Sequence, residues 1–234
     1  MNALKIVFWV LLAALLVSVI YFLNKVNAKK TENSSKKNII AQLTKDALFL
    51  AIILIMGFVP NMGYITVAPG VSLTLMHVPV LIGCCCFGWK RGWLYGLFFG
   101  ATSCIQALQN PIGFNAFFVY PWISILPRVI FGLVAGLVFD LLKKLPKILQ
   151  GRLGIGLAGF LMTILHTGLV FLDLFIFYPS EITAMFHTTS TIGNGLVVGF
   201  AVAILVGAAG EALLGGIVTA IVGPILKKLG ERKN

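Results

Sequence analysis

Long apolar stretches alternate with short polar connections along almost the whole chain. A helix needs about 20 mostly apolar residues to cross the ~30 Å hydrocarbon core of a bilayer, and several of the stretches approach or exceed that length. The pattern therefore predicts an all-α polytopic membrane protein. The expected spans are Ile6–Leu23, Leu48–Val59, Ser72–Phe87, Trp93–Leu108, Phe117–Leu142, Ile155–Tyr178 and Gly193–Leu226.

The first apolar stretch stands apart from the other six. We expect residues 1–24 to form an N-terminal transmembrane anchor, residues 25–37 a basic cytoplasmic linker, and residues 38–234 a six-helix transmembrane bundle. Val26–Lys30 loosely resembles a signal-peptidase site, but cleavage there would require the lysines that follow to lie outside. An uncleaved anchor is therefore the expectation.

The composition supports a membrane protein. Of 234 residues, 59% are hydrophobic and 11% are charged, and the mean hydropathy is +1.01. A soluble domain carries roughly 25% charged residues, so this chain could not cover a water-facing surface. The net charge of +11 would indicate nucleic-acid binding in a soluble protein. Here the placement of the basic residues gives a different explanation.

Lysine and arginine occur in every second connection. The basic connections hold Lys25, Lys29, Lys30, Lys36, Lys37 and Lys45, then Lys90 and Arg91, then Lys143, Lys144, Lys147 and Arg152, and finally Lys227, Lys228, Arg232 and Lys233. The connections Pro60–Val71, Gln109–Phe118 and Pro179–Ile192 hold none. Because cytoplasmic loops are enriched in basic residues, we expect the N-terminus outside and the C-terminus in the cytoplasm.

Three consecutive cysteines, Cys84 to Cys86, invite a metal or redox interpretation. Neighbouring residues on a helix point about 100° apart, so these thiols cannot converge on one metal ion. We expect them to be small packing residues, and no metal site is predicted.

Small residues recur at four-residue spacing. Such ridges let the backbones of membrane helices approach closely, so internal packing is the expected role of most of them. The glycine sets are Gly92, Gly96 and Gly100, then Gly132 and Gly136, then Gly195 and Gly199, and Ala47 and Ala51 form a similar pair.

Three segments together resemble the substrate-binding S component of energy-coupling factor (ECF) transporters. They are "LTLMHVPVLIGCCCFGWKRGWLYGLFFGATSCIQALQNP", "SILPRVIFGLVAGLVFDLLKK" and "GEALLGGIVTAIVGPILKKL". The resemblance covers about Asn38 to Leu229 and rests on the order of the motifs, since no single one is diagnostic. The extra N-terminal helix departs from the usual six-helix pattern.

The resemblance implies a fold, a function and partners. S components are six-helix proteins of prokaryotic plasma membranes that capture a vitamin or other micronutrient from outside. They dock on a membrane-embedded ECF subunit that is driven by two ATPases, so this chain would be no enzyme and would need no cofactor of its own. In the family an Ala-xxx-Ala patch faces the membrane subunit, and Ala47 and Ala51 match that patch. The nearest-looking members are of the pantothenate type.

Polar and aromatic residues gather at the uncharged connections, where the topology puts the outer mouth. A small-molecule pocket needs an apolar wall with a few aimed polar groups. The candidate substrate-binding residues are Asn61, Tyr64, His77, Gln106, Asn110, Asn115, Trp122, Arg128, Asp173 and Asn194.

Arg128 is the strongest single candidate, because it is the one basic residue that is expected to be neither cytoplasmic nor N-terminal. A buried guanidinium needs a partner, which is either a ligand carboxylate or phosphate or an internal acid such as Asp173. His77 could be packed or ligand-contacting, and the role of Glu211 is open. His166 and Asp173, seven residues apart, share a helix face, but two residues on one helix are a weak case for metal.

Two other functions were weighed against substrate capture. A membrane-embedded enzyme would need a nucleophile with its base, or paired metal ligands, and neither His-Glu-x-x-His nor Gly-x-Ser-x-Gly occurs. A stand-alone secondary transporter would be small with six core helices and shows no clear inverted repeat.

Overall fold

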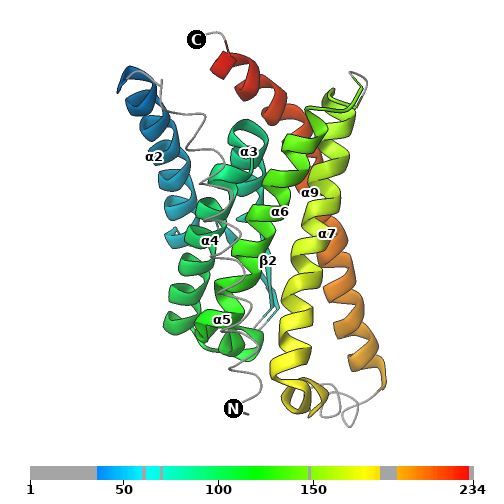
Figure 1. Cartoon of the computed structure of the whole chain (residues 1–234). Coiled ribbons are helices and arrows are strands. Elements are labelled where there is room, and N and C mark those ends of the chain that lie inside the picture. Colours follow the sequence, from blue (N-terminus) through cyan, green and yellow to red (C-terminus); the bar gives the residue numbers. More distant parts are fainter. Residues whose placement is uncertain (1–35, 60–61, 69–70, 147–148, 185–193, 232–234) are drawn as a thin grey trace. The chain divides into compact units, whose positions relative to one another are not determined.

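The computed structural model describes residues 36–59, 62–68, 71–146, 149–184 and 194–231 (Figure 1). The chain divides into two compact units, Met1–Leu48 and Phe49–Asn234, and the helix α2 (Lys36–Phe58) runs across the boundary. The expected anchor and most of the linker lie outside the described residues. The candidate site lies wholly within the second unit.

Helices dominate the second unit, in the order that the apolar stretches predict. After α2 come β1 (Tyr64–Ala68), β2 (Val71–Thr74), α3 (His77–Phe87), α4 (Trp89–Gln109), the 3-10 helix η1 (Gly113–Val119), α5 (Pro121–Ser124), α6 (Leu126–Leu142), α7 (Arg152–Phe177) and α9 (Asn194–Glu231).

Three helical stretches in the described part of the chain are long and apolar enough to cross a membrane. They are Pro121–Leu142, Arg152–Phe177 and Leu205–Leu226, whereas α3 is apolar but has only 11 residues. The structure agrees with a helical membrane protein, and the expected count of seven spans is not confirmed.

The expected start of the span Ser72–Phe87 was wrong, because a short hairpin precedes the helix. β1 and β2 form an antiparallel pair in which Tyr64 lies opposite Thr74 and Ile65 opposite Leu73. The two strands are rich in β-branched residues, and the Pro69-Gly70 dipeptide between them is a turn signal. The helix begins only at His77.

The expected single span Phe117–Leu142 is also divided. Prolines at positions 121 and 127 each stand in the first turn of a new helix, α5 and α6. Proline has no N–H to donate and disfavours a helical conformation in the residue before it, so a continuous helix cannot pass through either position undisturbed. The break places Arg128 in the first turn of α6.

Glycines bring the backbones of α4 and α6 into direct contact. A Cβ atom added at Gly96 would lie 2.1 Å from the carbonyl oxygen of Arg128, and one added at Gly92 would lie 2.1 Å from that of Gly132. The expected packing role of these two ridges is confirmed. The third pair, Gly195 and Gly199, lies where side-chain packing is not described.

Helices α7 and α9 also pack by close backbone approach at glycines, a contact that was not predicted from the sequence. A Cβ atom at Gly156 would lie 2.8 Å from that of Ala220, and one at Gly159 would lie 3.0 Å from that of Thr219. Small residues thus hold both helix pairs together by close backbone approach.

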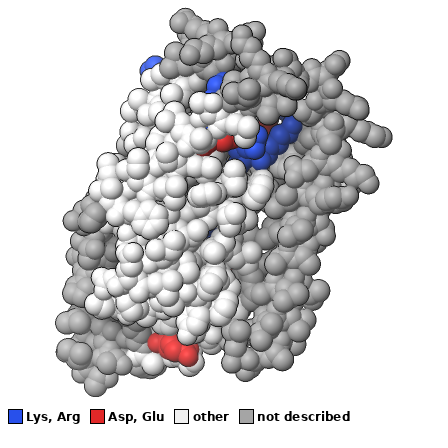
Figure 2. Space-filling view, turned by 90° about the vertical axis from the view of Figure 1, so that its left-hand side faces the viewer, with Lys and Arg blue, Asp and Glu red and all other residues white. Residues whose placement is uncertain are grey.

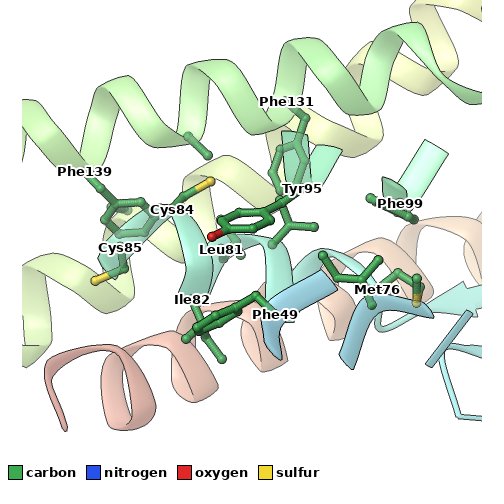
Figure 3. Close-up of a cluster of buried hydrophobic side chains, with 14 of the residues drawn as sticks. Phe49, Met76, Leu81, Ile82, Cys84, Cys85, Tyr95, Phe99, Phe131 and Phe139 are labelled. Carbon is green, nitrogen blue, oxygen red and sulfur yellow. The ribbon is translucent and has the colours of Figure 1, made fainter. Parts of the chain in front are cut away.

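The buried core joins α2, α3, α4 and α6 around large side chains such as Phe49, Tyr95 and Phe131 (Figure 3). The cysteines serve this packing. Cys84 faces α6, where its Sγ donates to the carbonyl oxygen of Gly132 over 3.4 Å, whereas Cys85 packs toward α9. None of the four cysteines, which all lie in the described residues, forms a disulfide, and adjacent thiols diverge as the helical geometry predicts.

Charged and uncharged connections lie at opposite ends of the second unit. At one end Asp140 accepts a hydrogen bond from the Trp89 backbone N–H over 3.0 Å and pairs with Lys143 at 2.6 Å, which brings two basic connections together. At the other end Tyr178 stacks against Tyr120, with ring centroids 5.5 Å apart. Figure 1 shows the α6–α7 connection and α5 at these opposite ends, and Figure 2 shows Lys and Arg gathered toward one end of a mostly uncharged face.

The glycine contact gives a first testable prediction. Gly96→Ala should lower the unfolding free energy by about 1–3 kcal/mol, because the new methyl group meets backbone that cannot rotate away. Gly168→Ala on α7 is the matched control, since a Cβ atom there meets nothing within 4 Å. Thermal unfolding in detergent measures both, and equal melting temperatures for the two variants would contradict the close-contact account.

Candidate functional site

Arg128 lies at the centre of the candidate site, in the first turn of α6. Its side chain is 4% exposed. The guanidinium carbon lies 4.7 Å from the ring centroid of Phe118 on η1 and 5.6 Å from that of Phe99 on α4. Nη1 donates to the carbonyl oxygen of Ile123 over 2.6 Å. Three elements therefore fix the orientation of this cation.

The charge of Arg128 is not neutralised by an ion pair among the described residues. Asp173 and Glu211 are the acids that interact with it electrostatically, but neither forms an ion pair with it there. Its Nε atom is buried and has no hydrogen-bond partner in the described part of the chain. Burying an unpaired charge is costly, so the guanidinium is a candidate for contact with an anion.

Helix α7 contributes two more buried polar side chains, His166 and Asp173, which are 4% and 5% exposed. Within the described residues both ring nitrogens of His166 and the Oδ2 atom of Asp173 lack a hydrogen-bond partner. They lie two turns apart on one face, as the sequence predicts. No group of three metal-ligating side chains forms in the described part of the chain.

An aromatic group borders this region at the uncharged end. Tyr120 stacks on Trp122 with centroids 5.0 Å apart and on Tyr178 at 5.5 Å, and Phe117 contacts Tyr178 at 5.2 Å. These contacts join the segment before α6 to the end of α7. The wall that they form is of the kind that encloses small ligands.

Glu211 anchors the hairpin to α9. Its carboxylate accepts a hydrogen bond from the backbone N–H of Thr74, and its carbonyl oxygen accepts one from Nε2 of His77 over 3.3 Å. The structure thus gives Glu211 a role that the sequence left open, which is to hold the β2–α3 junction. His77 is fully buried in the same contact.

The remaining predicted site residues are dispersed. The hydroxyl of Tyr64 lies beside Thr102 and Ser103 and interacts electrostatically with Arg128, so it belongs to the cluster. Gln106 instead donates to the carbonyl oxygen of Gly57 over 2.6 Å, which ties α4 to the end of α2. The others are Asn110, exposed after α4; Asn115, half-buried in η1; Asn194, the first residue of α9; and Asn61, which lies outside the described residues.

The sequence analysis missed the aromatic partners of Arg128 and did not include His166 among the site residues. Phe99 and Phe118 carry no signal of their own among 18 phenylalanines. His166 does carry one, because an ionisable residue in an apolar span is a functional candidate by default.

Comparisons with known proteins identify the family. A family model described as "ECF transporter, substrate-specific component" matches residues 41–227. The chain belongs to this family. The pantothenate transporter PanT of Leuconostoc mesenteroides is 30% identical over 191 residues, which cover 79% of this chain and 91% of that protein. The pantothenic acid transporter PanT of Lactococcus lactis is 32% identical over 154 residues, 58% of this chain and 73% of that protein.

Membership of the family fixes the class of function. The chain is the substrate-specific component of a membrane transporter and not an enzyme. It is a multi-pass membrane protein that takes a small-molecule substrate and associates with an ECF module in the membrane. The expected resemblance to S components is thereby confirmed.

Removal of Asp173 tests whether this acid neutralises Arg128 internally. Asp173→Ala should change the unfolding free energy of the ligand-free protein by less than about 1 kcal/mol, because no ion pair is lost. Breaking a true buried pair costs about 3–5 kcal/mol. Asp140→Ala is the control, since it removes the acceptor of the Trp89 N–H at the start of α4 and should cost about 1–2 kcal/mol.

Chemical unfolding of the ligand-free S component measures both variants. A loss for Asp173→Ala that exceeds the loss for Asp140→Ala would show that Asp173 is the internal counter-ion of Arg128.

Proposed function

We propose that this S component captures pantothenate from outside the cell and delivers it by docking to an ATP-driven ECF module. The observation that carries the proposal is the buried guanidinium of Arg128, which has an unpartnered Nε and no ion pair among the described residues. Pantothenate ends in a carboxylate, and arginine presents paired N–H donors that match a carboxylate. The two PanT relatives support the same ligand.

The site has the chemistry that an amphiphilic anion requires. The aromatic rings of Phe99 and Phe118 flank the guanidinium, which leaves its polar edge as the place where an anion gains hydrogen bonds. Asp173 offers an unpartnered acceptor for an N–H or O–H group of the ligand. Tyr64, Trp122 and the outer-loop asparagines Asn61, Asn115 and Asn194 remain proposed contributors.

The proposed orientation puts the uncharged end of the bundle outside. The two basic connections at residues 90–91 and 143–152 lie together at the other end, and basic loops favour the cytoplasm. The C-terminus would then be cytoplasmic and the N-terminus, beyond the anchor, outside. ATP would be used by two ATPase subunits of the module, so this chain would need no cofactor.

The docking face proposed for the ECF membrane subunit lies on α2. Ala51 is exposed there and stands next to the exposed Ile52, and Ala47 precedes it by four residues on the same helix. Small side chains let another helix approach closely in a membrane. The face is therefore suited to helix–helix contact within the bilayer.

Substitution of Arg128 tests the ligand. Arg128→Met keeps the length of the side chain but removes its charge, and it should raise the Kd for pantothenate by about 30-fold or more, since losing a buried charge contact costs 2–5 kcal/mol. Arg152→Met, at the exposed start of α7, should leave the Kd unchanged. Calorimetry in detergent measures both.

The alcohol analogue pantothenol, which lacks the carboxylate, makes this test specific. The wild-type protein should prefer pantothenate over pantothenol, and Arg128→Met should lose that preference. If Arg128→Met does not fold, Arg128→Lys keeps a charge without the paired donors and should show an intermediate preference. A variant without the guanidinium that still prefers the carboxylate would refute the anion contact.

Reconstitution tests the transport class. The purified chain alone in liposomes should bind pantothenate but not accumulate it, whereas addition of an ECF module and ATP should start uptake. Ala51→Trp should abolish uptake and leave the Kd unchanged, because it blocks docking only. Accumulation by the chain alone on an ion gradient would instead identify a secondary transporter.

A further inference from the structure

His166 is the buried polar side chain of α7 whose hydrogen-bonding groups are least satisfied. Its ring packs between Phe131, with centroids 5.0 Å apart, and Phe99, at 5.3 Å. Both ring nitrogens are buried without a partner in the described part of the chain. Figure 3 shows Phe99 and Phe131 projecting from α4 and α6 in the core cluster.

An imidazole without partners in an apolar site is costly to the free protein. Leaving a buried donor or acceptor unpaired costs about 1–3 kcal/mol. Two neighbouring polar groups have hydrogen-bond partners within the protein. His77 donates to the carbonyl oxygen of Glu211, and Thr163, one turn before His166, donates to that of Gly159 over 3.0 Å. Nδ1 of His77 is also buried without a partner, but of the two histidines that the structure describes, His166 is the one in which both ring nitrogens lack one.

His166 and Arg128 lie around the same aromatic ring. The guanidinium carbon of Arg128 lies 5.6 Å from the centroid of Phe99, and the imidazole lies 5.3 Å from it. The two side chains also interact electrostatically. Phe99 therefore contacts both polar side chains and joins them in one cluster.

We propose that His166 binds the hydroxyl-bearing end of the substrate and selects for it. This inference rests on the proposed function, because pantothenate carries two hydroxyls and two methyl groups at the end remote from its carboxylate. A neutral imidazole presents one donor and one acceptor on different sides of its ring, and a hydroxyl group can pair with either one. The rings of Phe99 and Phe131 make the surroundings of His166 apolar, which suits the two methyl groups.

Other roles for His166 fit the structure less well. A metal site would need further ligands, and no group of three His, Cys, Asp or Glu side chains gathers among the described residues. A purely packing residue would gain nothing from two unpaired nitrogens, since a phenylalanine would fill the same space without the desolvation cost.

The test compares the affinity for pantothenate with that for two analogues, each lacking one of its two hydroxyls. The wild-type protein should prefer pantothenate over at least one analogue by about 10-fold, the effect of one buried hydrogen bond. His166→Phe should bind pantothenate and that analogue equally. It should keep the preference for pantothenate over pantothenol, because Arg128 is intact.

Two controls separate ligand contact from structure. His77→Phe removes a histidine whose Nε2 bonds the Glu211 carbonyl oxygen, so it should lower the melting temperature and keep the hydroxyl preference. His166→Gln retains a donor and an acceptor and should restore part of that preference. If His166→Phe folds poorly, His166→Gln and His166→Leu are compared by the ratio of their affinities for pantothenate and the analogue. That ratio does not depend on the folded fraction, and it should be larger in His166→Gln.

The outcomes distinguish this inference from the function on which it rests. Failure of the wild-type protein to bind pantothenate would overturn both. Wild-type binding, together with an unchanged hydroxyl preference in His166→Phe, would overturn only the role of His166.

Discussion

The close contact between α4 and α6 is the constraint on which the candidate site depends. Gly96 leaves no room for a side chain against the carbonyl oxygen of Arg128, and Gly100 lies in the same way against the backbone of Ile125. The first turn of α6 is therefore held directly against α4. That contact places the guanidinium beside Phe99, where neither water nor lipid headgroups can solvate it.

The consequence is electrostatic. A cation in an apolar site raises the free energy of the protein unless an anion or a set of dipoles compensates it. Here the Ile123 carbonyl and the two phenylalanine rings compensate it in part, and Asp173 acts on it without forming an ion pair in the described residues. In the proposed function, a substrate carboxylate that enters the site offsets this cost. The unpartnered groups of His166 and Asp173 on α7 would gain hydrogen bonds in the same way from the neutral end of the proposed ligand.

Much of this arrangement could be predicted from the sequence because the bilayer imposes simple rules. Charge sorting singled out Arg128, and four-residue glycine spacing predicted close helix packing, which the structure shows between α4 and α6. Helical geometry correctly excluded convergence of the cysteines. The hairpin was missed because hydropathy averages over Val71–Thr74 and the helix that follows, although Pro69-Gly70 marked a turn. The side chains around Arg128 could not be predicted, because η1 and α4 meet only through tertiary packing. Nothing in the sequence distinguishes Phe118 from the other phenylalanines.

The most direct measurement is the distance between the bound ligand's carboxylate carbon and the Nε nitrogen of Arg128. Solid-state NMR with ¹³C-carboxylate pantothenate and ¹⁵N-arginine protein in lipid can measure this separation by dipolar recoupling. The account predicts a coupling equivalent to about 4 Å, as in a charge-assisted contact, which disappears in Arg128→Lys protein. A bound ligand with no coupling from its carboxylate to Arg128 would contradict the account.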